Sequence, residues 1–524
     1  MNSRPDPIAN EVFRHLFISV AEEMGVVLER TGFSPNIKER RDHSCAIFDA
    51  AGRLVAQAAH IPVHLGAFPL MMQAIVPRFR WRPGDVVICN DPFVGGTHLP
   101  DISVISPVFG GSGRRLGFVA NRAHHADIGG THPGSMGPTT EVFQEGVTFP
   151  PSRLRDRGRM NDALVEFFLR NVRTPEERRG DLAAQLGANT TGVQRFAEIA
   201  AVYGEREVRG RIRGAHRHTA DAVRRLIREL PPGEHSATDW LDDDGHGSGP
   251  LPICVSLGRR RGRLHVSFEG TAAQQRGSIN ATLAVTHSAV LYVLFCLLPD
   301  GVALNHGVFS ALDIAAPPGS LANAQPPAAV AAGNVETSQR MVDALLRALA
   351  AAMPNRIPAA SQGTMNNLTL GGMNPATGGL WAYYETTGGG AGADARSGGI
   401  NAVHCHMSNT RNTPAEALEY HYPLRVRRSA LRDNSGGAGL HPGGSGTVRE
   451  VELLAPATAT LLTDRRERGP YGLAGGDPGM PGANWIGAPG EWVSAPAKGT
   501  RHLVEGQRIR IETPGGGGWG TPTE

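Results

Sequence analysis

Apolar residues recur at helical spacing near the start of the chain. The residues on this apolar face are Val12, Leu16, Val20, Met24 and Val27. Their spacing places them on one side of an amphipathic helix that we expect to end near Arg30. Asp6 followed by Pro7 is typical of a helix N-terminus, because Asp caps the first turn and Pro fits the first helical position.

Short apolar or alternating segments, bounded by Gly, Pro and Asp, follow this helix and predict strands. They are residues 44–48, 53–57, 85–89, 102–105 and 116–120. The first two flank a turn and predict a β-hairpin. We expect Pro107 to end the fourth strand, because proline has no amide hydrogen to donate to a sheet.

The sequence pattern changes twice later in the chain, first from helical segments to short strands and then to glycine-rich segments. Residues 160–228 read as helical up to Pro231-Pro232, and short strands begin near residue 235. Segments 285–298 and 338–353 predict buried helices. From residue 363 onward glycine dominates, including the run Gly515 to Gly518, which we interpret as β-turns.

These patterns predict an α+β, multidomain fold, with mixed sheets and helices in the N-terminal part and a Gly-rich, β-rich C-terminal part. A chain of 524 residues exceeds the size that a single core usually serves. We expect an N-terminal α+β metal-binding region over 1–234, a central α/β region over 235–360 and the Gly-rich β-rich region over 361–524.

Composition excludes several classes of partner. The net charge is only +3, so there is no basic footprint for nucleic acid. The basic runs 259–263 and 465–468 are interpreted as solvated loops or edge strands. The longest apolar stretch, 289–298, is too short to span a membrane, and the polar N-terminus indicates no signal peptide. Five scattered cysteines without CxxC pairs predict no disulfide framework, so we expect a cytoplasmic protein.

Potential metal ligands are concentrated in two Gly- and Pro-rich loops, 90–101 and 121–130, that are fed by predicted strands. The potential ligands that lie close together in the sequence are His98, Asp101, His124, His125, Asp127 and His132. The spacing His-x-x-Asp occurs twice, and imidazoles with carboxylates are the ligand types that hold a divalent metal. A single histidine beside a strand is more often a hydrogen-bonded core residue. The density of the group favours a metal site.

Other candidates each allow two interpretations. Asp42 is either an arginine-paired surface carboxylate or a further ligand. His60 and His64 lie in a loop before a helix expected over 67–77, where they could line a pocket. Glu145, one helical turn after Glu141, is either a proton carrier or positioning residue, or a cap or surface residue. None of the glycine runs forms a phosphate-binding loop motif.

Several longer motifs in the chain carry a resemblance to a known family. They are Arg41 to Asp49, Asn90 to Asp101, His124 to Gly130, Glu145-Gly146, Gly333 to Ser338, Gln362 to Asn367 and Thr513 to Gly518. Across essentially its whole length the chain resembles the hydantoinase B/oxoprolinase family. Its nearest relatives in kind would be B subunits of ATP-dependent N-methylhydantoinases and lactamases, and the α subunit of acetone carboxylase would be a more distant relative.

The resemblance implies a divalent metal held by Asp42, His98, Asp101 and His124. Two imidazoles and two carboxylates suit Mn²⁺, Zn²⁺ or Fe²⁺. Whether His124 or its neighbour His125 is the ligand stays open. His125 and Asp127 become candidates for orienting ligands or water, and Glu145 for a general base or acid.

The resemblance also implies an A-type ATPase partner that uses ATP to phosphorylate the carbonyl oxygen of a small cyclic amide. We therefore expect a hetero-oligomer in which this chain is the metal-bearing subunit of an ATP-dependent cyclic amidohydrolase acting on hydantoins, 5-oxoproline or a related lactam. One alternative is the α-type subunit of an ATP-dependent ketone carboxylase. Another is a non-catalytic scaffold of the ATPase partner.

Overall fold

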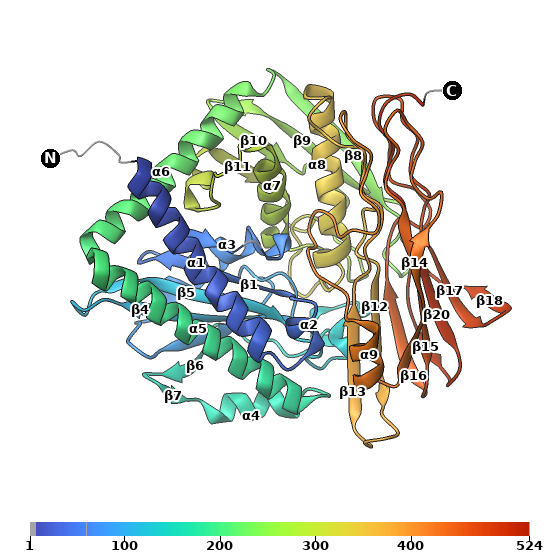
Figure 1. Ribbon diagram of the computed structural model, residues 1–524, viewed down its shortest axis with the longest axis horizontal. Coiled ribbons are helices and arrows are strands. Elements are labelled where there is room, and N and C mark those ends of the chain that lie inside the picture. The colour runs from blue at the N-terminus through green and yellow to red at the C-terminus, as the bar shows by residue number, and fades with distance from the viewer. Residues whose placement is uncertain (1–6, 59, 523–524) are drawn as a thin grey trace.

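The computed structural model describes residues 7–58 and 60–522, and Figure 1 shows helices beside several sheets. This arrangement confirms the α+β class. The first sheet has the strand order β2-β1-β5-β4-β3-β6-β7, and neighbouring strands run antiparallel. Its strands are β1 His43–Asp49, β2 Leu54–Gln57, β3 Val86–Cys89, β4 Asp101–Phe109, β5 Arg115–His124, β6 Ser152–Asp156 and β7 Arg159–Met160.

Helices cover both faces of this sheet, because its central strands are apolar on both sides. Cys45 and Ile47 of β1 pack in one core with α1 (Pro7–Thr31) and α5 (Pro175–Tyr203). The alternate residues Ala46 and Phe48 pack in another core with α3 (Ala67–Ile75). The predicted hairpin and first helix are confirmed, although the proposed capping residue Asp6 lies outside the described residues.

The expectation that Pro107 ends a strand is wrong. β4 continues to Phe109, with Pro107 opposite Phe118 of β5. The other neighbour, β3, pairs only with residues 103–105 of β4. Pro107 therefore lies beyond the part of β4 that is flanked on both sides, where a missing amide hydrogen is tolerated.

The predicted helical stretch 160–228 forms α4 (Asp162–Arg170), α5 and α6 (Glu205–Glu229). It leads into a second sheet of order β11-β10-β9-β8. These strands are β8 Glu234–Leu241, β9 Leu251–Arg260, β10 Arg263–Ser267 and β11 Leu312–Ala315. The predicted buried helices are confirmed as α7 (Leu283–Leu297) and α8 (Ser338–Ala352), and they share the largest core with α6 and this sheet.

The C-terminal part consists of two sheets that enclose one apolar core. The first, of order β13-β12-β16-β19, contains β12 Asn367–Met373, β13 Leu380–Glu385, β16 Ala457–Leu462 and β19 Lys498–Leu503. The second, of order β14-β15-β20-β17-β18, contains β14 Leu424–Arg432, β15 Gly446–Leu453, β20 Arg508–Glu512, β17 Ala483–Ala488 and β18 Glu491–Ser494. The strands form the right-hand side of Figure 1, and α9 (Ala415–His421) lies beside them.

Short helical turns connect these elements. They are α2 Pro35–Lys38, η1 Pro62–His64, η2 Val76–Arg78, η3 Pro133–Ser135, η4 Val142–Gln144, η5 His306–Ala311 and the π-helical turn η6 Gly333–Thr337. η6 runs directly into α8. Its residues 333–337 are all buried and lie in the interior, between the N-terminal sheet and the C-terminal strands.

The interpretation of Gly515 to Gly518 as β-turns is wrong. These residues form neither a turn nor a strand, and their amides donate to distant irregular segments; the Gly516 amide, for example, donates to the Gly444 carbonyl at 2.9 Å. A Cβ on Gly516 would lie 1.9 Å from the carbonyl oxygen of Ala391. The glycines are required here because backbones approach more closely than any side chain allows.

The largest apolar core crosses both predicted region boundaries, since it includes Ile61 and Leu462 together with the central helices. The division into three regions stays a prediction. No helix among the described residues is long and apolar enough to cross a membrane.

The second basic run lies in a loop, but only residues 467 and 468 are exposed, so our interpretation of it as a solvated loop is wrong for Arg465. Arg465 is 2% exposed, and its Nη2 lies 2.7 Å from Asp239 Oδ2 and 2.8 Å from Asp343 Oδ2. It belongs to a buried group that we call the Arg–Asp cluster: Asp239, Arg340, Asp343, Asp464, Arg465 and Lys498. The first basic run does lie at the surface, at the turn between β9 and β10.

Candidate metal centre

Three of the expected ligands lie in a row across neighbouring strands of the first sheet. Asp101, the first residue of β4, pairs directly with His124, the last residue of β5. On the other side of β5, the His124 amide donates to the Asp42 carbonyl at 3.0 Å, just before β1 begins. His98 reaches the row from the turn that leads into β4. We call these four residues the Asp–His pocket.

Their donor atoms form a compact triangle. His98 Nε2 lies 3.2 Å from His124 Nδ1 and 3.3 Å from Asp101 Oδ1, and His124 Nδ1 lies 3.4 Å from the same oxygen. A tetrahedral metal with bonds to nitrogen of about 2.0–2.1 Å has ligand-to-ligand edges of about 3.3–3.4 Å. The three side chains are therefore already spaced as one face of a coordination sphere.

These donors line a small cavity of about 20 Å³, which has room for about one water-sized particle. Asp42 lines the same cavity from the side of β1. The other lining residues are Ile61, Val63, His64, Asn334, Val335, Met365, Tyr384, Thr386, Met407, Ser408 and Thr410. They come from all three predicted regions, so the pocket exists only in the assembled fold.

Hydrogen bonds orient His98 and Asp101 towards the cavity. His98 Nδ1 lies 3.1 Å from the carbonyl oxygen of Ala331, and donation there leaves the lone pair of Nε2 for a ligand. Thr97 and His64 bind the outer oxygen of Asp101, with His64 Nε2 at 3.1 Å. The inner oxygen, Oδ1, is thereby left to face His98 and His124.

The other two members of the pocket have unused donor atoms. No described residue forms a hydrogen bond or ion pair with the Asp42 carboxylate, although this residue is 7% exposed. Nε2 of His124 likewise has no partner in the described part of the chain, while its ring stacks on Tyr384 at 4.7 Å between centroids. Buried polar groups are normally satisfied, so the unpaired carboxylate of Asp42 beside the triangle fits a divalent cation, whereas the unpaired Nε2 of His124 is not the nitrogen that faces the triangle.

Electrostatics within the pocket agree with a cation site. Burial raises the pKa of Asp101, but the imidazoles of His98 and His64 outweigh it and hold this pKa well below its usual range. Burial lowers the pKa of His124. Burial also opposes protonation of His98, yet the Asp101 carboxylate raises the pKa of this imidazole. Positive charge beside Asp101 is thus favoured in a place where little water reaches.

Glu145 lies behind the pocket rather than in its lining. Its Oε1 accepts hydrogen bonds from the amides of Val330 and Ala331, each at 2.9 Å, and from the Thr139 hydroxyl. Burial raises its pKa to about 7. Because the carbonyl of Ala331 also accepts the bond from His98, Glu145 helps to hold the residue that orients the imidazole. A direct role in proton transfer stays a prediction.

His125 and Asp127 are not brought to the cavity. Successive residues of a strand point to opposite faces, so His125 faces α5, where Nε2 lies 3.0 Å from Gln185 Oε1. Asp127 accepts from the amides of Gly129 and Gly134 and pairs with Arg173 at 2.9 Å. Their predicted catalytic roles remain predictions, and His132 does not line the cavity either.

Sequence reasoning missed two residues that contact the expected ligands. Nδ2 of Asn334 lies 3.1 Å from His98 Nε2, and the ring of Tyr384 covers His124. Asn334 stands in one of the motifs that carry the family resemblance, which was an available signal. The sequence gave no signal for Tyr384, because this residue lies 260 positions after His124. The suggestion that His64 lines a pocket is confirmed.

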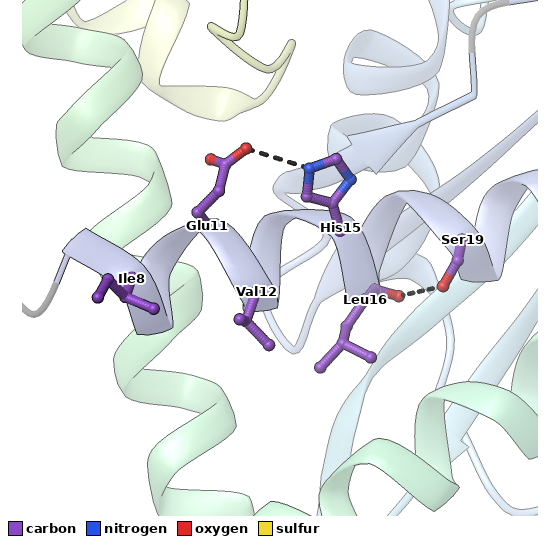
Figure 2. A pocket seen from close by; sticks show the side chains of 6 residues that line it. All are labelled: Ile8, Glu11, Val12, His15, Leu16 and Ser19. Carbon is purple, nitrogen blue, oxygen red and sulfur yellow. Dashed lines mark hydrogen bonds and ion pairs between the residues drawn. The ribbon is translucent and has the colours of Figure 1, made fainter.

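A larger hollow of about 690 Å³ lies on the outer side of α1, and Figure 2 shows its lining side chains. They are Ile8, Glu11, Val12, His15, Leu16 and Ser19. Its only acid and imidazole pair with each other, since His15 Nε2 lies 3.1 Å from Glu11 Oε1. The hollow is open and mostly apolar, and it lacks the convergent donors of the Asp–His pocket.

Comparison with known proteins gives a consistent set of relatives. A family model described as hydantoinase B/oxoprolinase matches residues 6–522. 5-oxoprolinase 1 of Arabidopsis thaliana is 37% identical over 98% of this chain, which spans only 42% of that protein. The B subunit of a putative D-/L-hydantoinase from a Pseudomonas species is 32% identical, with 99% of this chain and 90% of that protein covered.

Two solved structures share the fold. The ATP-dependent caprolactamase of Pseudomonas jessenii superposes with a TM-score of 0.92 at 29% identity, covering 99% of this chain and 92% of that chain. Nucleotide-free acetone carboxylase superposes with a TM-score of 0.91, covering 99% of this chain and 76% of that chain. Its 18% identity shows likeness of fold alone.

Proposed function

Because the chain belongs to the hydantoinase B/oxoprolinase family, we propose that it is the metal-bearing subunit of an ATP-dependent cyclic amidohydrolase. The proposed substrate is a small lactam, such as a hydantoin or 5-oxoproline, whose carbonyl oxygen has been phosphorylated by an ATPase partner. The relatives named 5-oxoprolinase and hydantoinase, and the likeness to an ATP-dependent caprolactamase, support this class of reaction.

The observation that carries the proposal is the triangle of His98 Nε2, Asp101 Oδ1 and His124 Nδ1, with edges of 3.2–3.4 Å, and Asp42 beside it. These residues would hold Mn²⁺, Zn²⁺ or Fe²⁺, since no softer ligand is present to choose among them. A divalent metal bound there would lower the pKa of water and polarise a carbonyl oxygen.

The remaining residues would place the reacting groups. The Asn334 amide and the Tyr384 ring border the donors and would position the ring of the substrate. Glu145, through Ala331, would keep His98 aimed at the cavity. In the reaction, one water adds to the carbonyl carbon of the O-phosphorylated lactam, and the C–N bond breaks as the nitrogen takes up a proton, which leaves an acyl phosphate. A second water then hydrolyses the acyl phosphate to the carboxylate and inorganic phosphate. A lactam ring exceeds a cavity of about 20 Å³, so the lining has to part for the substrate to bind.

An ATPase partner is part of the proposal. One relative is named as the B subunit of a hydantoinase, and the caprolactamase is ATP-dependent. The chain contains no phosphate-binding loop motif. The nucleotide chemistry is therefore assigned to an A-type ATPase chain, and the two chains would form a hetero-oligomer.

The test uses this chain co-purified with its ATPase partner, a panel of lactams and ATP. We expect ring opening by the unaltered complex and its loss in His98→Ala, while the partner still turns over ATP at least in part. His502→Ala, which changes an exposed histidine in the C-terminal part, is the matched control and should retain full activity. Full product formation by His98→Ala would refute the role of the pocket.

The fold shared with acetone carboxylase supports a second candidate, in which the same metal and partner serve an ATP-dependent ketone carboxylase. Bicarbonate-dependent consumption of a ketone, with no ring opening of any lactam, would favour it. A third candidate, a scaffold of the ATPase, requires that no metal binds and that Asp101→Ala keeps full activity of the complex.

A further inference from the structure

A second cluster of potential metal ligands lies on the opposite face of β1. His43 and Cys45 are two positions apart on this strand, so both side chains face the core beneath α1. His60, which follows β2, reaches the same place, and its ring meets that of His43 edge to face with 4.7 Å between centroids. One ligand atom from each of the three side chains lies within 4.8 Å of the others.

Three ring nitrogens of this cluster are buried without a hydrogen-bond partner among the described residues. His43 is 1% exposed, and neither of its ring nitrogens has a partner within residues 7–58 and 60–522. Nδ1 of His60 has no partner within the same residues. An unsatisfied buried polar group costs about 1–3 kcal/mol, so unpartnered nitrogens converging on a buried thiol point to a bound ligand.

The backbone of α1 makes room for this arrangement. A Cβ on Gly25 would lie 2.5 Å from Cε1 and 2.7 Å from Nε2 of His60, and 3.6 Å from Cε1 of His43. The imidazole of His60 occupies its position only because residue 25 has no side chain, whereas that of His43 lies at an ordinary contact distance. α1 therefore covers the cluster closely, and the three ligand side chains are held from β1 and from the segment after β2.

We infer that His43, Cys45 and His60 form a second metal site, which takes a zinc-type divalent cation. Two imidazoles and a thiolate are a ligand set that zinc favours. The thiolate is softer than any donor of the Asp–His pocket, so the two sites differ in the metal they prefer. A cation here would tie β1 to the segment that leads to His64, and it would act on the pocket by holding that segment in place.

The test reads the thiolate directly. The full chain is stripped of metal and titrated with Co²⁺, because a cobalt–thiolate bond absorbs in the near ultraviolet and a site built from imidazoles and carboxylates has no such band. We expect the band in the unaltered chain and in Asp101→Ala, which removes a ligand of the other site. We expect its loss in Cys45→Ser and its persistence in Cys89→Ser, which changes another buried cysteine.

His60→Ala guards against a folding defect, because His60 is half-buried in a connecting segment. The circular dichroism of His60→Ala should be unchanged. The variant should bind cobalt at the thiolate site more than about tenfold more weakly, since removal of even an outer-shell partner costs that much. The inference is overturned if excess Co²⁺ gives no thiolate band, or if the band survives in folded Cys45→Ser. It stands or falls independently of the proposed function, whose test does not involve this band.

Discussion

Two buried groups of charged and polar side chains in this protein differ in how their charge is balanced. In the Arg–Asp cluster every carboxylate has a cation from the chain itself: Asp464 lies 2.8 Å from both Arg340 Nη2 and Lys498 Nζ. In the Asp–His pocket the carboxylate of Asp101 meets only imidazoles and a hydroxyl, and that of Asp42 meets no described partner.

This contrast indicates where the fold needs a ligand. Burying charges is costly unless they are paired, and the Arg–Asp cluster meets this requirement with groups from β8, α8, β19 and the segment after β16. The pocket collects its donors around a cavity, and we propose that a divalent cation balances their charge. One group is paired entirely within the chain, and the other keeps polar atoms that have no partner among the described residues.

An Asp→Asn substitution in the Asp–His pocket and another in the Arg–Asp cluster should distinguish the two groups most clearly. Asp101→Asn removes a ligand while keeping an acceptor for Thr97 and His64. We expect lactam ring opening to fall by at least about 100-fold, the upper end of what loss of an outer-shell partner costs. The metal-free protein should lose less stability than it does after the same change in the Arg–Asp cluster, because the amide oxygen still accepts from Thr97 and His64. The checks are the steady-state rate of the complex and the metal content per chain.

Asp343→Asn makes the same chemical change in the Arg–Asp cluster. Asp343 Oδ2 lies 3.2 Å from Arg340 Nη1 and 2.8 Å from Arg465 Nη2, so its loss leaves two buried guanidinium groups short of an anion. We expect the free energy of unfolding to fall by about 3–5 kcal/mol, measured by urea denaturation. Metal content should be unchanged. Equal loss of stability in Asp101→Asn and Asp343→Asn would remove the distinction between the two groups.

Much of the fold followed from sequence because its signals are local. The helical spacing after Pro7 reflects the one face of α1 that is buried, the apolar run of β1 reflects burial on both faces, and the structure bears out both elements. What failed depended on distant neighbours. Pro107 is tolerated within β4 because β3 is too short to reach it, and Arg465 is buried because acids from β8 and α8, both distant in the sequence, surround it.

The candidate site divides in the same way. His98, Asp101 and His124 could be selected from their density near strand ends, and the period of β5 turns His124 to the pocket and His125 to α5. Asp42 needed the family resemblance, since only the pairing of β1 with β5 brings it beside His124. Asn334 and Tyr384 come from elements far along the chain, so no local pattern could place them.

Glu336 tests how far the Arg–Asp cluster reaches, through the dependence of stability on pH. Burial, with a further contribution from the Asp464 charge, raises its pKa to about 8, although Lys498 opposes this. The folded protein therefore holds a proton that the unfolded chain releases above about pH 4.5. Stability should fall as the pH rises from about 4.5 to about 8, at about 1.4 kcal/mol per pH unit at most.

Glu336→Gln should remove this pH-dependent contribution to stability. The free energy of unfolding of the variant should therefore rise relative to that of the unaltered protein as the pH rises, by a few kcal/mol at about pH 8. Urea denaturation at several pH values is the measurement. Glu141→Gln, which changes an exposed carboxylate near the pocket loops, is the control and should leave the slope unchanged. An identical slope in Glu336→Gln would show that Glu336 is ionised in the folded state.

The smallest expected effect is that of Tyr384→Phe, which tests whether Tyr384 only packs against His124 or also takes part in the reaction. The Tyr384 ring covers His124, while its hydroxyl turns away and donates to Asn367 Oδ1 at 2.8 Å. Tyr384→Phe keeps the ring and leaves one acceptor unpaired, so we expect a loss of about 1–3 kcal/mol in stability and less than a tenfold change in the rate of ring opening.

Tyr383→Phe is the matched control on the same strand, because it removes the hydroxyl that donates to Glu385 Oε2 at 2.8 Å on the face turned to the C-terminal core. It should cost similar stability and leave the rate unchanged. A rate loss well above tenfold in Tyr384→Phe alone would mean that this hydroxyl leaves Asn367 to act on the substrate when the lining parts. The wall of the pocket would then take part in the chemistry instead of only holding His124 in place.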